Sequence, residues 1–206
     1  MEAQWLDWAR RLQAISQNGL EYAANPFDRE RYEAVRRVAA EIMAAGAGVI
    51  LEPVLNLFMH ESGYATPKVD VRGVVFQNDA LLLVKERADN AWTLPGGWAE
   101  PGLSPRENVV KEVLEESGYE TRVVQLLAVY DRTRHPHRPP LPFHIYKFFF
   151  RCEITGGRPV PSVETADVGF FREGEIPPLS VMRVTPQQIA RMFDHHRHPE
   201  WPPDCD

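Results

Sequence analysis

Three glutamates lie close together in the segment Lys-Glu-Val-Leu-Glu-Glu-Ser-Gly-Tyr, residues 111–119. In a helix, which turns by about 100° per residue, Glu112, Glu115 and Glu116 fall within an arc of roughly 100°. Like charges at these spacings repel one another, and carboxylates are unfavourable near the C-terminal end of a helix. Because Mg²⁺ and Mn²⁺ prefer oxygen ligands, bound cations would turn both penalties into affinity. The pattern therefore indicates either a divalent-cation site or, as the simpler interpretation, a solvated helix face.

The flanking residues define the ends of this helix. Ser104 suits the N-cap, Glu107 suits the reciprocal position of a capping box, and the intervening Pro105 suits the first turn. Gly118 suits the C-terminal stop. We therefore expect a helix from Pro105 to Ser117. Its apolar side is expected to consist of Val109, Val110, Val113 and Leu114.

Two glycines in the loop ahead of this helix, Gly96 and Gly97, follow a short predicted strand at residues 91–94. Glycine permits backbone angles that other residues avoid, and it lets main-chain groups approach closely. A carbonyl of this loop could reach a cation held by the helix, although an ordinary strand-to-helix turn would use glycine too.

The segment from Gly97 to Tyr119 resembles the signature of the Nudix hydrolases. That signature is glycine, five residues, glutamate, seven residues, arginine-glutamate, an apolar residue, any residue, two glutamates, any residue, glycine and an apolar residue. Seven of its nine specified positions agree here, and the departures are Leu103 for glutamate and Lys111 for arginine. The resemblance covers roughly residue 66 to the C-terminus. It implies an α/β (α+β) fold, a Nudix-type α/β/α sandwich with a mixed sheet, preceded by a small helical domain.

A helical N-terminal region followed by residues 63–72, Gly-Tyr-Ala-Thr-Pro-Lys-Val-Asp-Val-Arg, resembles one bacterial subgroup of this family. That subgroup is similar to CDP-choline pyrophosphatase and ADP-ribose pyrophosphatase. We therefore expect a helical domain over residues 1–62 and a Nudix domain over residues 63–206. The resemblance implies hydrolysis of the phosphoanhydride bond in a nucleoside diphosphate linked to another moiety, with Mg²⁺ or Mn²⁺ as cofactor.

The resemblance also implies roles for individual residues. The expected metal ligands are Glu112, Glu115, Glu116 and a carbonyl of Gly96 or Gly97. Glu112 and Glu164 are the two candidates for the general base. Glu164 lies in Pro-Ser-Val-Glu-Thr-Ala-Asp, just before a predicted strand, and it also fits an ordinary loop carboxylate. The expected catalytic residues are thus Glu112, Glu115, Glu116 and Glu164.

Several basic side chains are candidates for binding the substrate. Arg87 lies shortly before the glycine loop, although a surface role fits it equally well. The basic, proline-rich segment 131–142 joins two predicted strands, either as a loop that covers the substrate or as an exposed connection. The expected substrate-binding residues are Arg87, Lys111, Arg132 and Arg134.

Two other functions are compatible with the sequence. Lysine lacks the planar fork of arginine, so Leu103 and Lys111 also fit a Nudix-fold module that senses a ligand or binds a protein with little catalysis. Loss of the glutamate, however, removes the need for its arginine partner, so the two changes can compensate. An RNA-processing hydrolase is the other alternative, and the net charge of −6 disfavours it because broad RNA binding uses many Lys and Arg contacts.

The N-terminal third of the chain is expected to be helical. One apolar stripe with three- and four-residue spacing consists of Trp5, Trp8, Ala9, Leu12 and Ile15. A second stripe consists of Tyr32, Val35, Ala39 and Ile42. Helices this short cannot bury both stripes by themselves, so they must pack on the rest of the chain or on a second copy. A homodimer is therefore expected.

Strands are expected to dominate from residue 69 onward. Val69–Phe76 and Ala80–Arg87 flank Gln77-Asn78-Asp79, which predicts a hairpin. Further strands are expected at residues 122–131, 143–154 and 168–171, and a capping box at Thr185 predicts a last helix to about residue 195.

The composition bounds the setting of the protein. Of 206 residues, 44% are hydrophobic and 25% are charged, which is ordinary for a globular protein. The sequence contains no apolar run long enough for a membrane span, and its beginning does not resemble a secretory signal. Cys152 and Cys205 are too few for a disulfide framework, so a cytoplasmic location is expected.

Overall fold

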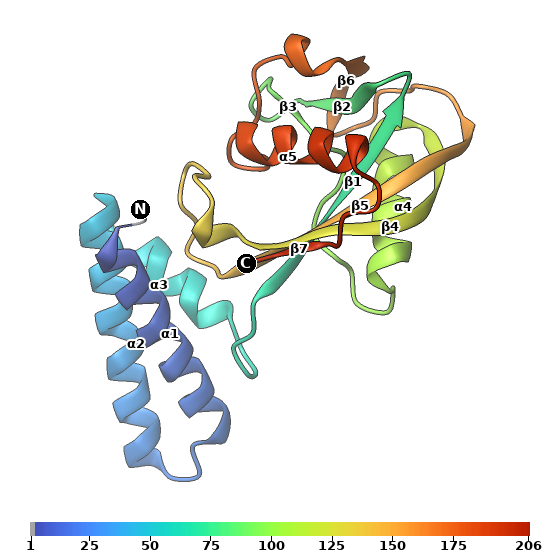
Figure 1. The fold of residues 1–206 in the computed structure, drawn as a ribbon. Coiled ribbons are helices and arrows are strands. Elements are labelled where there is room, and N and C mark those ends of the chain that lie inside the picture. Colours follow the sequence, from blue (N-terminus) through green and yellow to red (C-terminus); the bar gives the residue numbers. More distant parts are fainter. Residues whose placement is uncertain (1–2) are drawn as a thin grey trace. The chain divides into compact units, whose positions relative to one another are not determined.

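The computed structural model describes residues 3–206 (Figure 1). Its contacts divide the chain into two compact units. The first unit extends to Pro67 and includes Leu141–His144, and the second contains Lys68–Pro140 and Ile145–Asp206.

The first unit is built from three helices, α1 (Gln4–Tyr22), α2 (Pro26–Ala47) and α3 (Leu51–His60). Small alanine side chains at the contact between helices allow close packing. The buried core consists of Leu6, Ala9, Ala39, Ala40, Met43, Ala44, Val54 and Phe58. Helix α3 was not predicted from the sequence. Its Pro53 lies in the first turn, where proline is tolerated because the N–H there has no helical partner.

The apolar stripe predicted for the first helix is only partly buried within this chain. Trp8 and Ile15 are 48% and 56% exposed, so these two residues do not belong to the core. Polar side chains occupy buried positions instead. The Ser16 hydroxyl donates to the Tyr32 carbonyl at 2.7 Å, and the Gln13 amide donates to the Phe58 carbonyl at 3.2 Å. These hydrogen bonds satisfy the Ser16 hydroxyl and the Gln13 amide nitrogen, which would otherwise be costly to bury.

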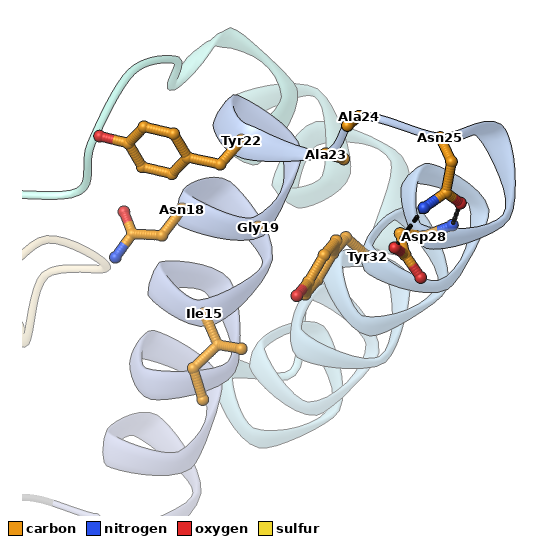
Figure 2. Close-up of a pocket in the computed structure, with 9 residues that line it drawn as sticks. All are labelled: Ile15, Asn18, Gly19, Tyr22, Ala23, Ala24, Asn25, Asp28 and Tyr32. Carbon is orange, nitrogen blue, oxygen red and sulfur yellow. Dashed lines mark hydrogen bonds between the residues drawn. The ribbon is translucent and has the colours of Figure 1, made fainter.

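An open pocket of about 530 Å³ lies where α1 ends and α2 begins (Figure 2). Ile15 and Tyr22 of α1 and Tyr32 of α2 contribute to its lining. The Asn25 side chain caps α2 at this end by accepting the Asp28 N–H at 2.8 Å. None of the residues predicted to bind metal or substrate lines this pocket.

The second unit contains a seven-stranded mixed sheet in the order β3-β2-β1-β5-β4-β7, with β6 also paired to β2 (Figure 1). The strands are β1 (Lys68–Gln77), β2 (Ala80–Glu86), β3 (Trp92–Thr93), β4 (Tyr119–Asp131), β5 (Ile145–Gly157), β6 (Thr165–Phe171) and β7 (Asp204–Cys205). Strand β1 runs parallel to β5, and β4 runs parallel to β7, while the other pairs are antiparallel. The predicted hairpin is confirmed, with Asn78 and Asp79 at positive φ angles of 50° and 60° as a tight two-residue turn requires.

Two helices pack on the sheet, α4 (Pro105–Ser117) and α5 (Pro186–Arg197). Successive side chains of a strand point to opposite faces. Val75 of β1 therefore packs with Val113 of α4, whereas the neighbouring Val74 packs with Met192 of α5. The predicted α/β/α sandwich with a mixed sheet and preceding helices is confirmed. Across residues 3–206, no helix has both the length and the apolar character needed to span a membrane.

Candidate active site

Helix α4 begins and ends at the predicted residues. The Glu107 N–H donates to the Ser104 hydroxyl at 3.3 Å, and the Glu107 carboxylate accepts the Ser104 N–H at 2.8 Å, which forms the capping box. Gly118 ends the helix in the left-handed conformation, with φ of 78°. The predicted apolar side is wrong at one position, because Leu114 is 45% exposed. The buried side is rotated toward Glu116 and Ser117.

Glu116 is a buried carboxylate and not part of a solvated helix face. It is only 6% exposed, and one of its oxygens accepts the Gly96 N–H at 2.8 Å. Burial raises the pKa of Glu116 to about 8, and the negative charges of Glu86 and Glu112 add to this effect, while Arg72 opposes it. A cation that binds beside such a carboxylate stabilises its charged form.

Glu112 is half-buried and lies against the glycine loop. A Cβ atom added to Gly97 would lie 2.9 Å from a carboxylate oxygen of Glu112, so a side chain there would displace the carboxylate. Gly96 has φ of +139°, and a Cβ atom there would lie 2.0 Å from the Val71 carbonyl oxygen. Gly96 is therefore required for the loop to approach β1 as closely as it does, whereas a side chain at Gly97 would need only a shift of the Glu112 carboxylate.

The glycine loop is held along β1 by main-chain hydrogen bonds. The Gly73 N–H donates to the Pro95 carbonyl at 2.8 Å, and the Val71 N–H donates to the Gly97 carbonyl at 2.9 Å. Of the two glycine carbonyls, that of Gly97 is thus already used as an acceptor. The strand fixes the loop, and the loop in turn fixes Glu116 through the Gly96 N–H.

Glu115 makes different contacts from the other two glutamates. Its carboxylate is 3.3 Å from the Lys111 ammonium nitrogen, and its side chain is 55% exposed. The same lysine nitrogen is 3.0 Å from a carboxylate oxygen of Glu100. The structure therefore gathers Glu112 and Glu116 at the glycine loop, and it places Glu115 in a separate ion-pair group.

Arg87 is engaged in holding a turn. Its guanidinium donates to the Ser162 carbonyl at 3.2 and 3.3 Å, and its main-chain N–H donates to the Glu164 carbonyl at 2.9 Å. The bonds fix the segment that carries Glu164 against the end of β2. The Arg87 side chain therefore supports this turn.

Glu164 is exposed and lies just before β6. The following residue, Thr165, donates its hydroxyl to the Glu116 carbonyl at 2.8 Å, which ties the start of β6 to the end of α4. The charge of Glu164 contributes to raising the pKa of Glu112, an effect that comes mainly from burial. Glu164 therefore lies close enough to the helix glutamates to interact with them electrostatically.

The loop after β4 carries the two predicted arginines in different environments. Arg132 is buried, and its guanidinium donates to the carbonyls of Pro139 at 2.9 Å and Met182 at 3.3 Å. Arg134 is exposed. Of the two side chains, only that of Arg134 is accessible from solvent in this structure.

A buried charge cluster beside the site was not predicted from the sequence. Asp70 and Arg72 of β1 and Lys147 of β5 are each at most 6% exposed. The Arg72 guanidinium holds both oxygens of Asp70, at 2.9 and 2.6 Å, and also donates to the Leu94 carbonyl at 3.1 Å. Lys147 forms an ion pair with Asp70. The spacing of Asp70 and Arg72 two residues apart in an otherwise apolar strand is a signal that could have revealed this cluster.

Burial and neighbouring charges shift the pKa values in this cluster. Burial alone raises the pKa of Asp70, but the positive charges of Arg72 and Lys147 outweigh this effect and lower it to about 2. Burial lowers the pKa of Lys147 to about 7, because the attraction of Asp70 is opposed by Arg72 and Arg132. Asp70 is therefore ionised, and it neutralises Arg72, the arginine whose charge acts on Glu116.

Glu86, at the end of β2, is another buried acid that was not predicted. Its carboxylate lies 2.9 Å from the Arg183 guanidinium, and burial raises its pKa. It also contributes to the raised pKa of Glu116. Glu86 comes close to the end of α4 because β2 pairs with β6, and no local sequence pattern specifies that pairing.

The donor atoms at the glycine loop fit a hard divalent cation. They are carboxylate oxygens of Glu112 and Glu116 together with main-chain carbonyl oxygens, which Mg²⁺ and Mn²⁺ prefer. No three His, Cys, Asp or Glu side chains within residues 3–206 converge as a ready-made metal cage. The remaining ligands would then be water and substrate phosphate, which is the usual arrangement for Mg²⁺.

Comparison with known proteins gives the family. Residues 66–193 match the model of the NUDIX domain, and residues 3–58 match that of a UDP-X-like, N-terminal oligomerisation domain. A Bacillus subtilis protein named "Putative ADP-ribose pyrophosphatase YjhB" is 48% identical over 200 residues, covering 97% of this chain and 96% of that protein.

Two solved structures support the same assignment. The crystal structure of a UDP-X diphosphatase is 34% identical with a TM-score of 0.64, and the match covers 98% of each chain. The crystal structure of an ADP-ribose pyrophosphatase from Streptococcus suis is 37% identical with a TM-score of 0.62, covering 68% of this chain and 100% of that one. The matched signature, the sandwich fold and these relatives together show that the chain belongs to the Nudix hydrolase family.

Proposed function

We propose that this Nudix hydrolase cleaves the phosphoanhydride bond of a nucleoside diphosphate linked to a second moiety, with Mg²⁺ or Mn²⁺ as cofactor. The observation that carries the proposal is the placement of Glu112 and Glu116 against the two glycines of the loop. The names of the relatives support this substrate class, because they include ADP-ribose pyrophosphatases and a UDP-X diphosphatase. ADP-ribose and UDP conjugates are thus the first substrates to test, followed by CDP-choline.

In this proposal the chain supplies oxygen ligands and fixed charges. Glu112, Glu116 and the Gly96 carbonyl would hold a cation, with Glu115 as a further ligand. When bound, the cation would neutralise the diphosphate and lower the pKa of a bound water. The Arg72 charge attracts Glu116, and its pairing with Asp70 avoids a strong net positive charge beside the cation site.

Glu112 and Glu164 are the proposed candidates for the general base. Each would accept the proton of the attacking water, and each needs an ionised carboxylate near the scissile bond. Glu112 is favoured by its position against the glycine loop, and Glu164 by its greater exposure. Comparison of Glu112→Gln with Glu164→Gln decides between them. The general base is the residue whose substitution abolishes the fall of the hydrolysis rate at acidic pH while Mn²⁺ binding is retained.

Substrate phosphates are proposed to contact the loop after β4. Arg134 is the better candidate than Arg132, because the Arg132 guanidinium already donates to two carbonyls. Arg87 and Lys111 are weaker candidates, since one holds the Ser162 turn and the other is paired with two glutamates. Their side chains would have to exchange these partners for phosphate.

We further propose that the chain forms a homodimer through its helical unit. Trp8, Ile15 and Tyr22 of α1 recur at seven-residue intervals and are 48%, 56% and 70% exposed. This spacing places the three side chains along one side of the helix. An exposed apolar stripe of this kind fits a helix of a second copy, and the matched family model is that of an oligomerisation domain. A cytoplasmic location remains a prediction.

A panel of substrates tests the proposed activity. The purified chain is incubated with ADP-ribose, UDP-glucose, CDP-choline, nucleoside triphosphates and a short RNA, each with and without Mg²⁺. We expect metal-dependent release of a nucleoside monophosphate from at least one diphosphate conjugate. Tight binding of a conjugate without turnover would instead favour a sensing module, and shortening of RNA alone would favour RNA processing.

A further inference from the structure

The charged pair of the Nudix signature is rearranged in this chain. Leu103, at the position where the signature has glutamate, is 38% exposed and carries no charge. Lys111, at the arginine position, instead has its ammonium nitrogen 3.0 Å from a carboxylate oxygen of Glu100. A carboxylate three residues earlier in the loop therefore meets the basic residue of the signature.

The position of Glu100 is built into the loop by a buried amide. Asn108, in α4, is only 1% exposed. Its Oδ1 accepts the Glu100 N–H at 2.8 Å, and its Nδ2 donates to the Glu100 and Leu103 carbonyls at 3.3 and 3.2 Å. The main chain at Glu100 is thus fixed relative to the helix, although its side chain is 55% exposed.

Glu100 also determines the charge around Glu115. Lys111 lies between the two carboxylates, 3.0 Å from Glu100 and 3.3 Å from Glu115, so the three groups together carry one negative charge. Without Glu100, the lysine would pair with Glu115 alone, and the charge of that pair would be zero. Because exposed ion pairs contribute little to stability, the loss should appear in cation binding and not in folding.

We propose that Glu100 replaces the missing signature glutamate as a positioning residue: it holds the Lys111 ammonium so that Glu115 keeps its orientation and the three groups together keep a net negative charge for the cation. This inference rests on the proposed metal-dependent function. It explains how the site tolerates Leu103 and Lys111 together.

The test compares Glu100→Gln with a matched control, Glu173→Gln. Glu173 also forms an exposed ion pair, with Arg197 at 2.6 Å, but this pair involves none of the signature residues. Two quantities are measured: Mn²⁺ binding by electron paramagnetic resonance, and the Mn²⁺ concentration that gives half-maximal hydrolysis. We expect Glu100→Gln to lower the affinity for Mn²⁺ and to raise the half-maximal Mn²⁺ concentration, each by roughly fivefold. This is the effect of removing one nearby charge in a solvated setting. Glu173→Gln should change neither, and the thermal midpoints of both variants should match that of the parent.

A rescue variant separates positioning from a general charge effect. In the triple variant Glu100→Gln/Leu103→Glu/Lys111→Arg, the charges occupy the positions of the family signature. We expect Mn²⁺ binding to return to within about twofold of the parent, because a bidentate pair replaces the lost one. The inference is overturned if Glu100→Gln binds Mn²⁺ like Glu173→Gln, or if the triple variant is as weak as Glu100→Gln. If the parent binds Mn²⁺ but hydrolyses nothing, the proposed function fails, while the binding comparison still decides the role of Glu100.

Discussion

At the scale of single residues, the chain keeps opposite charges in its interior where they can stabilise each other and the site. Asp70 is the only acid that contacts both Arg72 and Lys147 within the described cluster. A buried ion pair adds little net stability over apolar packing, but removal of one partner leaves the other charges uncompensated. Asp70 therefore contributes to stability because its two basic neighbours are buried beside it.

Asp70→Asn is expected to destabilise the protein by about 3–5 kcal/mol at neutral pH, because the buried Arg72 guanidinium loses its counter-ion and Lys147 loses its ion-pair partner. The pKa of Asp70 in the folded state, about 2, lies below its ordinary value of 3.8. Its stabilising contribution is therefore complete above pH 3.8 and is lost as the pH falls through about 2. Urea unfolding at pH 7 and at pH 2.5 measures this, and the effect of the substitution should be smaller at the lower pH.

Asp167→Asn is a suitable control, because Asp167 is exposed and accepts only the Val168 N–H at 2.8 Å. An equal loss of stability in both variants at pH 7 would contradict the role assigned to Asp70.

At the scale of elements, the loop between β3 and α4 is held along β1 and leads into the helix that carries the carboxylates of the site. Local sequence signals predicted this helix well, since the capping box at Ser104 and the stop at Gly118 depend only on neighbouring residues. They could not predict that Leu114 is exposed, because which side of a helix is buried depends on the sheet that it meets. Contacts between distant strands explain why Glu86 and Lys147 were also missed.

Gly96→Ala is expected to displace this loop. The residue has φ of +139°, and the added Cβ would lie 2.0 Å from the Val71 carbonyl oxygen. Backbone strain of this kind costs about 1–3 kcal/mol, and the Gly96 N–H would also move away from Glu116. We expect a lower thermal midpoint and a large loss of turnover.

Gly174→Ala provides the control, because among residues 3–206 no atom beyond its own chain neighbours lies within 4 Å of the position of its added Cβ. If the two alanine variants behave alike in both stability and turnover, the glycine loop does not need the conformation described.

At the scale of the whole molecule, the helical unit presents an apolar stripe that its own core does not cover. The sequence predicted an apolar stripe on α1 that packs either on the rest of the chain or on a second copy. The exposure of Trp8 and Ile15 favours a second copy.

Ile15→Glu is therefore expected to convert a dimer to a monomer, because a charge would be buried in the interface. Light scattering coupled to size-exclusion chromatography measures the mass directly. The same substitution at Val124, which is 40% exposed on β4, should leave the mass unchanged. A parent chain that runs as a monomer would remove the proposal of a homodimer.

The most direct test of the proposed activity is hydrolysis of ADP-ribose before and after removal of divalent cations, in the parent and in Glu116→Gln. The account predicts that chelation abolishes turnover, that Mg²⁺ or Mn²⁺ restores it in the parent, and that Glu116→Gln stays at least about 100-fold slower in kcat. Glu175→Gln, an exposed carboxylate in the second unit, should behave like the parent. Turnover that survives chelation, or a Glu116→Gln variant with the parent's rate, would contradict the account.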